Sequence, residues 1–419
     1  MSTVPPHQVV VIGGGYAGLT TAARIAESEA AVSVILVDAK TQFVERIRLH
    51  EIAAGSTPRD LDYEAFMQDR GGAFIQGRVE ALDTASKSVR LLGPNGVEQS
   101  LEYDTLVYAL GSQTDLTRVP GAAQYAVGLD SSEGSITLFR TLESLAKSGG
   151  TILIAGGGLT AIEAACEFAE RLPGLDVKIA PGRSFGPDAG PGGLSAAGHN
   201  HVLSTLQRLN VEIIDGARIV EVASDQANLE DGRSVPFDVC VWGAGFSVPG
   251  LAADAGIRVN RSGQIETDDT LVSVSHPDIV AVGDAAEVIA DPAGVCRTSC
   301  AAGRPMGERA ARTVLDRLAD QPPHPFRVRI QFPMRQPGPG RWTHPVRRCT
   351  GPRGGGSLDR RPRGPMEGVY LSTDAERRRL RRRSRPPTGY AAKRTANIGG
   401  PALGVSNPGF PAPRAPAAR

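Results

Sequence analysis

The sequence predicts an α/β protein with two Rossmann-like, doubly wound dinucleotide-binding domains and an irregular C-terminal tail. Two glycine-rich turns of the same kind support this fold. The first reads GGGYAG at residues 13–18, after the apolar run VVVI, and the second reads GGGLTA at residues 156–161, after the run TILI. Each combines a strand, a tight turn and a helix N-terminus, which offers backbone N–H groups to a pyrophosphate. Two such turns predict two bound dinucleotides.

Two carboxylates strengthen the prediction for the first turn. The run SVILV at residues 33–37 has the pattern of a second buried strand, and Asp38 follows it, at a place where a carboxylate can accept hydrogen bonds from a ribose. A later apolar run, DIVAVG at residues 278–283, delivers Asp284 to the end of another strand, where it could accept from a ribityl hydroxyl. As purely structural residues, Asp38 would be an exposed loop residue and Asp284 a helix N-cap. We therefore expect FAD at the first turn.

The second turn departs from the dinucleotide fingerprint. Ala161 replaces its third glycine, which still permits close packing of helix on strand, and the next strand, residues 177–180, ends without an acidic residue. The missing carboxylate leaves the choice between NADH and NADPH open, and Arg183 is near enough to favour a 2′-phosphate. A Rossmann-like lobe without a ligand is the alternative.

Five segments, in this order, resemble the two-dinucleotide flavoproteins. They are VVVIGGGYAG, TLVYALGS at residues 105–112, ILIAGGGLTAIEAA, VCVWGAGF at residues 239–246 and IVAVGDAAEV. Within that family they are similar to the type II NADH dehydrogenase-like and apoptosis-inducing-factor-like oxidoreductases, over about residues 8–325. The segment FVERIRLHEIAAG, residues 43–55, resembles the branch usually called NADH dehydrogenase-like. The resemblance implies FAD and NAD(P)H as cofactors.

The motifs also imply which residues contact each cofactor. The expected FAD contacts are Gly13, Gly15, Tyr16, Ala17, Gly18, Asp38, Ala39, Arg46, Val79, Ala109, Gly111, Gly283 and Asp284. The expected NAD(P)H contacts are Gly156, Gly158, Leu159, Thr160 and Gly245.

Three residues are candidates for a catalytic role. Glu163 matches a glutamate that lies near the nicotinamide and flavin rings in the family; its alternative role is to complement the dipole at a helix N-terminus. Arg48 and His50 alternate with Arg46 after the second strand, which suggests a cationic patch that steadies a reduced flavin or a quinone oxygen, with His50 as a general base. A solvated charged loop is the simpler interpretation of the same cluster.

The cysteines decide against disulfide chemistry. The five are Cys166, Cys240, Cys296, Cys300 and Cys349. Only Cys296 and Cys300 are neighbours, and their spacing is neither that of a redox dithiol nor that of a metal site. We therefore expect no metal, and an acceptor other than a protein disulfide.

The expected function is FAD-dependent oxidation of NADH or NADPH, with electrons passed to a quinone or similar small acceptor. A reductase of a small electron-transfer protein such as ferredoxin is one alternative. A non-catalytic redox sensor or an inactive remnant is another.

Domain organisation and location follow from the motif order. We expect FAD binding at residues 1–116 and 247–325, with the NAD(P) domain inserted at 117–246. Neither an export signal nor an apolar run of about 20 residues is present, which predicts a cytoplasmic enzyme. Peripheral contact with the inner face of the cell membrane and a homodimer are compatible with the sequence, whereas no nucleic-acid-binding module is recognisable.

The tail at residues 326–419 differs from the rest of the chain. It is rich in Arg, Pro and Gly and loses hydrophobic periodicity, which predicts disorder. If MRQPGPGRWTHPV, residues 334–346, is read one nucleotide later, its codons permit a string that resembles the C-terminal flavin-covering segment of the same family. We therefore expect a reading-frame slip near residues 326–330, and resequencing the gene there tests it.

Overall fold

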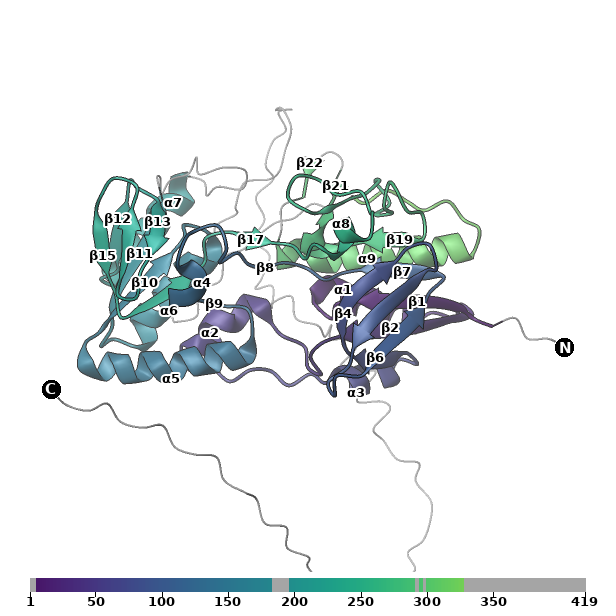
Figure 1. Ribbon diagram of the computed structural model, residues 1–419, viewed down its shortest axis with the longest axis horizontal. Helices are drawn as coiled ribbons and strands as arrows, with labels where there is room; N and C mark the ends of the chain where they lie inside the picture. The colour runs from purple at the N-terminus through teal and green to yellow at the C-terminus, as the bar shows by residue number, and fades with distance from the viewer. Residues whose placement is uncertain (1–4, 183–195, 291–293, 297–298, 328–419) are drawn as a thin grey trace, which may run out of the picture. The chain divides into compact units, whose positions relative to one another are not determined.

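The computed structural model describes residues 5–182, 196–290, 294–296 and 299–327 (Figure 1). Arg183, Cys349 and nearly all of the 326–419 tail therefore lie outside the described residues, and so does the expected reading-frame slip beyond residue 327. Two five-stranded parallel sheets dominate the described part, which confirms the predicted α/β class.

The first sheet contains the first glycine turn. Its strand order is β3-β2-β1-β7-β19, and the strands are β1 (His7–Ile12), β2 (Val32–Asp38), β3 (Ala73–Gln76), β7 (Thr105–Tyr108) and β19 (Ile279–Ala281). The four apolar residues at 9–12 are fully buried, as expected for a parallel strand covered on both faces. Helices α1 (Tyr16–Ala26) and α9 (Cys300–Leu318) pack closely together, with α3 (Tyr63–Gln68) nearby. The sheet thus joins chain segments from both sides of the second lobe.

The second sheet repeats this arrangement. Its order is β12-β11-β10-β16-β9, with β9 (Ala126–Gly128), β10 (Thr151–Ala155), β11 (Asp176–Gly182), β12 (Glu212–Asp215) and β16 (Val239–Trp242). Helices α5 (Ser132–Ser148), α6 (Leu159–Arg171) and α7 (Ala196–Arg208) belong to the same lobe. Both lobes have the doubly wound arrangement, in which the strand that leads into the glycine turn, β1 or β10, is central.

Two short strands carry the chain between the lobes. β8 (Gln113–Thr114) leads into the second lobe and β17 (Phe246–Ser247) leads out of it, and the two pair antiparallel (Figure 1). The expected boundaries at residues 116 and 246 are close to these strands, and the division into cofactor domains stays a prediction.

The remaining elements are short. They are η1 (Arg46–Arg48), α2 (Leu49–Ala53), β4 (Arg78–Asp83), β5 (Ser88–Leu92), β6 (Glu98–Glu102), α4 (Ala122–Tyr125), β13 (Ile219–Val222), β14 (Gln226–Leu229), β15 (Ser234–Pro236), α8 (Leu251–Asp254), β18 (Ile265–Glu266), η2 (Gly283–Ala285), β20 (Ala286–Glu287), β21 (Ile289–Ala290) and β22 (Gly294–Val295).

Two local predictions need correction. The sequence from Val79 to Val97, with GPNG at residues 93–96, predicts a hairpin closed by that turn. The structure instead has a three-stranded meander, in which the GPNG turn joins β5 to β6 and the Val79 strand, β4, pairs with β5. The sequence predicts the last helix over Gly303 to Leu318, with Pro305 tolerated in the first turn. The helix begins at Cys300 instead, so Pro305 lies in its second turn. A proline there removes one backbone N–H from the helical hydrogen-bond ladder.

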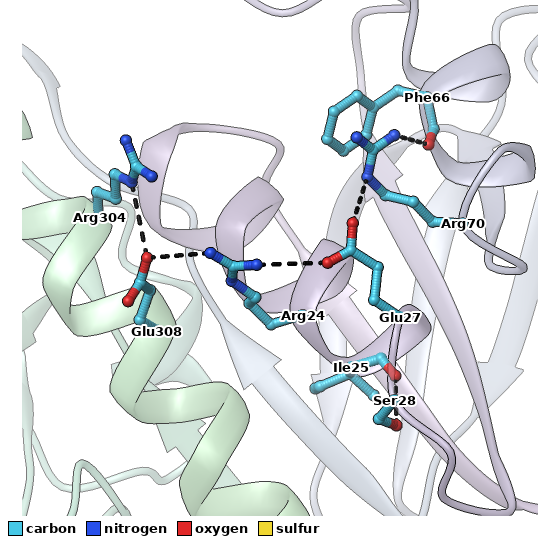
Figure 2. A network of polar contacts seen from close by, with 8 residues as sticks. All are labelled: Arg24, Ile25, Glu27, Ser28, Phe66, Arg70, Arg304 and Glu308. Atoms are coloured by element: carbon cyan, nitrogen blue, oxygen red, sulfur yellow. Dashed lines mark hydrogen bonds and ion pairs between the residues drawn. The ribbon is translucent and has the colours of Figure 1, made fainter. Parts of the chain in front are cut away.

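A surface network of charges ties three helical segments together (Figure 2). Glu308 on α9 lies 3.4 Å from Arg24 on α1, which lies 3.4 Å from Glu27, which in turn pairs with Arg70 at 3.1 Å. Arg70 follows α3, and its guanidinium stacks on the Phe66 ring at 3.7 Å. These exposed pairs connect α9 to the same helices that pack beside the first glycine turn.

Candidate cofactor and active site

The first turn can be built only with glycine at two of its positions. Gly13 has φ +97°, and a Cβ there would lie 2.4 Å from the Ala109 carbonyl oxygen. A Cβ on Gly18 would lie 1.9 Å from the Gly13 carbonyl oxygen. At both positions, backbone atoms of β1, α1 or the segment after β7 pack so closely that no side chain would fit.

Gly15 serves a different purpose. Its backbone is ordinary, with φ −65° and ψ −174°, and a Cβ there would meet no atom within 4 Å. It is the N-cap of α1, and no side chain caps that helix end. The first turn thus leaves an open cradle beneath uncapped N–H groups, which fits the pyrophosphate of a dinucleotide.

Asp38 closes one side of this cradle, at the end of β2. Its carboxylate accepts hydrogen bonds from the Gly14 N–H at 2.6 Å and the Lys40 N–H at 2.9 Å. A carboxylate offers about four lone-pair positions, so it can still accept from ribose hydroxyls. The hydroxyl of Tyr63 donates to the Gly14 carbonyl at 2.8 Å and holds the turn from the other side.

The ends of β7 and β19 place Asp284 at the same edge of the sheet. Asp284 lies on η2 rather than at a helix N-cap, and the Ser112 hydroxyl donates to its carboxylate at 2.7 Å. Gly111 and Gly283 both have positive φ, +67° and +73°, and a Cβ on Gly111 would meet nothing within 4 Å. The geometry leaves space beside Asp284 for a polyhydroxylated chain such as ribityl.

The other expected FAD contacts are more scattered. The Tyr16 ring meets the Phe43 ring edge-on at 5.0 Å, and Ala17 is buried at the start of α1. Ala39 is exposed, and its carbonyl accepts from the Gln76 amide at 3.2 Å, whereas half-buried Val79 pairs across β4 and β5. The contact of each of these residues with FAD stays a prediction.

The second turn repeats the first. Gly156 has φ +120°, and a Cβ there would lie 2.7 Å from the Gly243 carbonyl oxygen. Gly158 has φ −78° and ψ 173°, is the N-cap of α6 without a side-chain cap, and has no atom within 4 Å of a Cβ position. Leu159 and Thr160 begin that helix. Gly245, with φ +99° and open space around it, lies after β16, so a nicotinamide nucleotide fits this edge.

A buried tryptophan adjoins the second turn. Trp242 ends β16, is only 3% exposed, and donates from Nε1 to the Ala244 carbonyl at 3.1 Å. This bond fixes the small-residue turn at 243–245 against the sheet.

Arg46 points to the strands that connect the lobes. Its guanidinium donates to the Ser112 carbonyl and, from Nη2, to the Asp130 carboxylate at 3.1 Å. Asp130 also accepts from the backbone N–H and the hydroxyl of Thr114, both at 3.0 Å. Arg46 therefore contacts the protein around the flavin site through Ser112, which in turn binds Asp284.

The expected cationic patch is not formed by Arg48 and His50. Arg48 donates from Nε and Nη2 to one Glu51 oxygen, at 2.9 and 2.6 Å, so its charge is balanced locally. His50 is 6% exposed on α2, and burial lowers its pKa to about 4, with a smaller opposing effect of Glu51. The His50 imidazole is therefore neutral at pH 7. The segment that carries Arg48 and His50 is helical rather than a charged loop because its apolar residues are buried in the core.

Glu163 belongs to a cluster of carboxylates where α2 packs against α6. Burial raises its pKa to about 7, and Glu51 and Glu167 add to the shift. Glu167, one turn further along α6, is 2% exposed; burial raises its pKa to about 7 against the opposing charge of Arg171, whose Nε lies 2.6 Å away. A carboxyl group with such a pKa can hold or release a proton at neutral pH.

Two of the described cysteines lie in the protein core. Cys166 and Cys240 are buried on α6 and β16, and burial raises the pKa of each thiol to about 12. Cys296 is half-buried. Within the described ranges no group of three metal-ligating side chains comes together. No described helix is both long and apolar enough to cross a bilayer.

Two polar groups at these sites lie outside every motif quoted above. Asp130 accepts from Arg46, and Glu167 adds to the rise in the pKa of Glu163. Only spacing could have suggested them: Glu167 follows Glu163 by one helical turn, and Asp130 follows the end of a strand.

Comparison with known proteins agrees with this geometry. The chain is 29% identical over 335 residues to an NADH dehydrogenase-like protein of Mycobacterium tuberculosis, covering 75% of this chain and 82% of that one. It is 26% identical over 369 residues to a type II NADH:quinone oxidoreductase of Haemophilus influenzae, covering 76% and 82%. Its fold resembles a ferredoxin reductase from Rhodopseudomonas palustris, with a TM-score of 0.66, 22% identity and coverage of 78% and 79%.

The family profile for pyridine nucleotide-disulphide oxidoreductases matches residues 7–307, a span that contains both glycine turns, Asp38, Glu163 and Asp284. Membership of this family means that the chain binds FAD and NAD(P)H, while the assignment of one cofactor to each turn stays a prediction. The chain thus belongs to the pyridine nucleotide-disulphide oxidoreductase family and is an FAD-dependent NAD(P)H oxidoreductase.

Proposed function

We propose that the chain takes hydride from a nicotinamide nucleotide at the second turn and delivers the electrons, through FAD at the first turn, to a quinone or a similar small acceptor. The observation that carries this proposal is the state of the described thiols. Cys166 and Cys240 are buried on different elements and strongly biased toward the protonated form. Thiolate is the reactive form, and burial holds both thiols in the protonated form, which favours an acceptor other than a disulphide. A relative named for quinone reduction supports the choice of acceptor.

Bound FAD would supply the transfer of hydride and electrons between the two substrates. The protein would bind the cofactors, orient them and shield them from water. Gly15 and Gly158 leave room for two pyrophosphates, and Asp38 and Asp284 offer acceptors to sugar hydroxyls. Reduction of a quinone to a quinol also consumes protons. We infer that Glu163, whose pKa of about 7 lets its carboxyl oxygen carry a proton, supplies one near the reacting groups.

An anaerobic rapid-mixing experiment tests the function. The flavin band near about 450 nm is followed after mixing with NADH or NADPH, and then after adding a menaquinone analogue. Bleaching followed by recovery supports the proposal. If the bleached flavin recovers only when a ferredoxin is added, the acceptor is a protein rather than a quinone. If neither nucleotide bleaches the flavin, the chain has a non-catalytic role.

A quinone acceptor partitions into lipid, so we propose a cytoplasmic enzyme that contacts the inner face of the cell membrane peripherally. Co-sedimentation with vesicles of acidic lipid tests this location. A homodimer stays a prediction, and light scattering of the purified chain measures it directly.

A further inference from the structure

The end of β11 lacks the group that usually selects NADH. In doubly wound domains an acidic residue at the end of the second strand binds the adenosine ribose 2′-hydroxyl, whereas a nearby arginine accommodates the 2′-phosphate of NADPH. Here β11 ends Ala180-Pro181-Gly182, without a carboxylate. Gly182 has φ +99°, so an acidic side chain would be strained at that position.

An arginine lies against this strand end instead. A Cβ on Gly182 would be 3.6 Å from Cγ of Arg218, the nearest atom to it. The Arg218 side chain is 62% exposed, and its ion pair with Glu230 is long, with 3.7 Å between Nε and Oε2. The aliphatic part of Arg218 therefore lies against the strand end, while its side chain is exposed enough for the guanidinium to meet an incoming anion.

A second arginine lies at the neighbouring strand. Gly182 is in register with Asp215 at the end of β12, and Arg233 donates from Nη2 to the Asp215 carbonyl at 2.7 Å. Arg233 also pairs through Nε with Asp231 at 2.8 Å, which balances its charge. Arg233 thus steadies the turn after β12, and Arg218 is the arginine whose side chain adjoins the end of β11.

We propose that the nicotinamide donor of this chain is NADPH and that Arg218 binds its 2′-phosphate. The inference rests on the proposed function, since it concerns the donor of the same reaction. Arginine suits a phosphate because its planar guanidinium donates two parallel hydrogen bonds and stays charged. The dianionic phosphate would compete with Glu230 for Arg218, and the carboxyl end of β11 presents no carboxylate to repel it.

Asp215 is the competing group. Its carboxylate lies on the strand beside Gly182 and could accept from a 2′-hydroxyl, which would favour NADH. The Asp215→Asn variant separates the two assignments. If the donor is NADPH, its affinity for a 2′-phosphate should stay the same or rise. If Asp215 binds the ribose of NADH, its affinity for an unphosphorylated ribose should fall.

Binding of nucleotide fragments tests the proposal without flavin chemistry. Adenosine 2′,5′-bisphosphate and 5′-AMP are titrated calorimetrically into the FAD-loaded protein at low salt. We expect the bisphosphate to bind at least about tenfold more tightly, and Arg218→Ala to remove about that factor while 5′-AMP affinity stays the same. Arg140→Ala, which removes an exposed arginine from α5 of the same lobe, is the matched control.

Equal affinity for the two fragments, or an Arg218→Ala variant that keeps the preference, overturns the proposal. Because the exposed Arg218 is not part of the core, the variant's circular dichroism should match the wild type. If the preference is absent but NADH bleaches the flavin and quinone restores it, only the donor assignment fails. If the preference holds and no quinone is reduced, only the acceptor fails.

Discussion

The Arg46 guanidinium lies 3.1 Å from the Asp130 carboxylate, and the same group donates to the Ser112 carbonyl. Ser112 binds Asp284 at the flavin edge, while Asp130 binds Thr114 on the strand that leads into the second lobe. One side chain therefore connects the expected flavin site to the chain crossing between lobes, and its expected direct contact with FAD stays a prediction.

We expect Arg46→Ala and Asp130→Asn each to weaken FAD retention several-fold, and the double variant to cost little more than either one. Residues in one hydrogen-bonded network are not additive, with coupling on the order of 1 kcal/mol for a half-exposed pair. A double-mutant cycle on FAD affinity, measured by fluorescence of released flavin, checks this. Strict additivity would mean that the two side chains act independently.

Gly15→Ala and Gly158→Ala form a matched pair. Both backbones suit alanine and both Cβ positions are open, so each variant should fold normally. The added methyl fills the cradle in front of an uncapped helix end, so Gly15→Ala should lose FAD and Gly158→Ala should keep FAD but resist reduction by nucleotide. Flavin content and bleaching report the two separately.

Gly18→Ala is the contrasting change in the same turn. Its Cβ would lie 1.9 Å from a carbonyl oxygen, so we expect poor soluble yield rather than a selective loss of cofactor. A well-folded Gly18→Ala protein that binds FAD would contradict the assigned packing of α1 on β1.

Glu163→Gln should slow quinone reduction by roughly 10- to 100-fold and remove a step in its pH profile. The wild-type carboxyl has a pKa near 7, so the protonated form, and with it the rate, should decline as pH rises through about 7. Hydride uptake by the flavin should change little, which separates proton supply from misfolding. An unchanged profile in the variant would assign the step to another group.

Glu167 and His50 should affect the free energy of unfolding in opposite ways as pH changes. Burial raises the Glu167 pKa from 4.5 to about 7, so its contribution is present below pH 4.5 and lost as pH rises through 7. Burial lowers the His50 pKa from 6.5 to about 4, so its contribution is present above pH 6.5 and lost as pH falls through 4. Relative to wild type, Glu167→Gln should gain stability above pH 7.

The matching His50→Gln variant should gain relative stability below pH 6, for the opposite reason. Urea unfolding at pH 5 and pH 8 measures both differences. Parallel curves for wild type and variants across this range would show that neither buried group titrates differently on folding.

The charge network of Figure 2 should matter little by itself. Its carboxylates are 38–39% exposed, and such pairs contribute about 0–1 kcal/mol. We expect Glu27→Gln to change the melting temperature by only a few degrees at low salt and not at all in about 1 M salt, where charges are screened. A larger loss would imply that Arg70 positions the turn through α3.

Much of the fold was visible in the sequence because both sheets obey the same local rules. The runs at 9–12 and 152–154 are apolar on both faces, and each is followed by glycines that no other residue can replace at positive φ. Recognition of the family followed from the order of these motifs, and the comparison confirmed it. Pro305 misled the start of the last helix because the tertiary contacts of α9 with α1 outweigh one lost hydrogen bond.

The electrostatics of the site could not be predicted in this way. Whether Arg48 is a free cation depends on Glu51, and whether His50 is charged depends on its burial under α5 and α6. Both are properties of packing between elements distant in sequence. The cofactor contacts assigned to single residues stay predictions, and the flavin and nucleotide binding measurements test them.

Trp242 gives the nucleotide lobe an internal optical sensor. The chain has two tryptophans, and Trp342→Phe would leave only the indole next to the 243–245 turn. Emission from that single ring would then follow nucleotide docking and melting of one lobe, while flavin fluorescence follows the other. Following tryptophan emission and flavin fluorescence together would show which of the two lobes unfolds first.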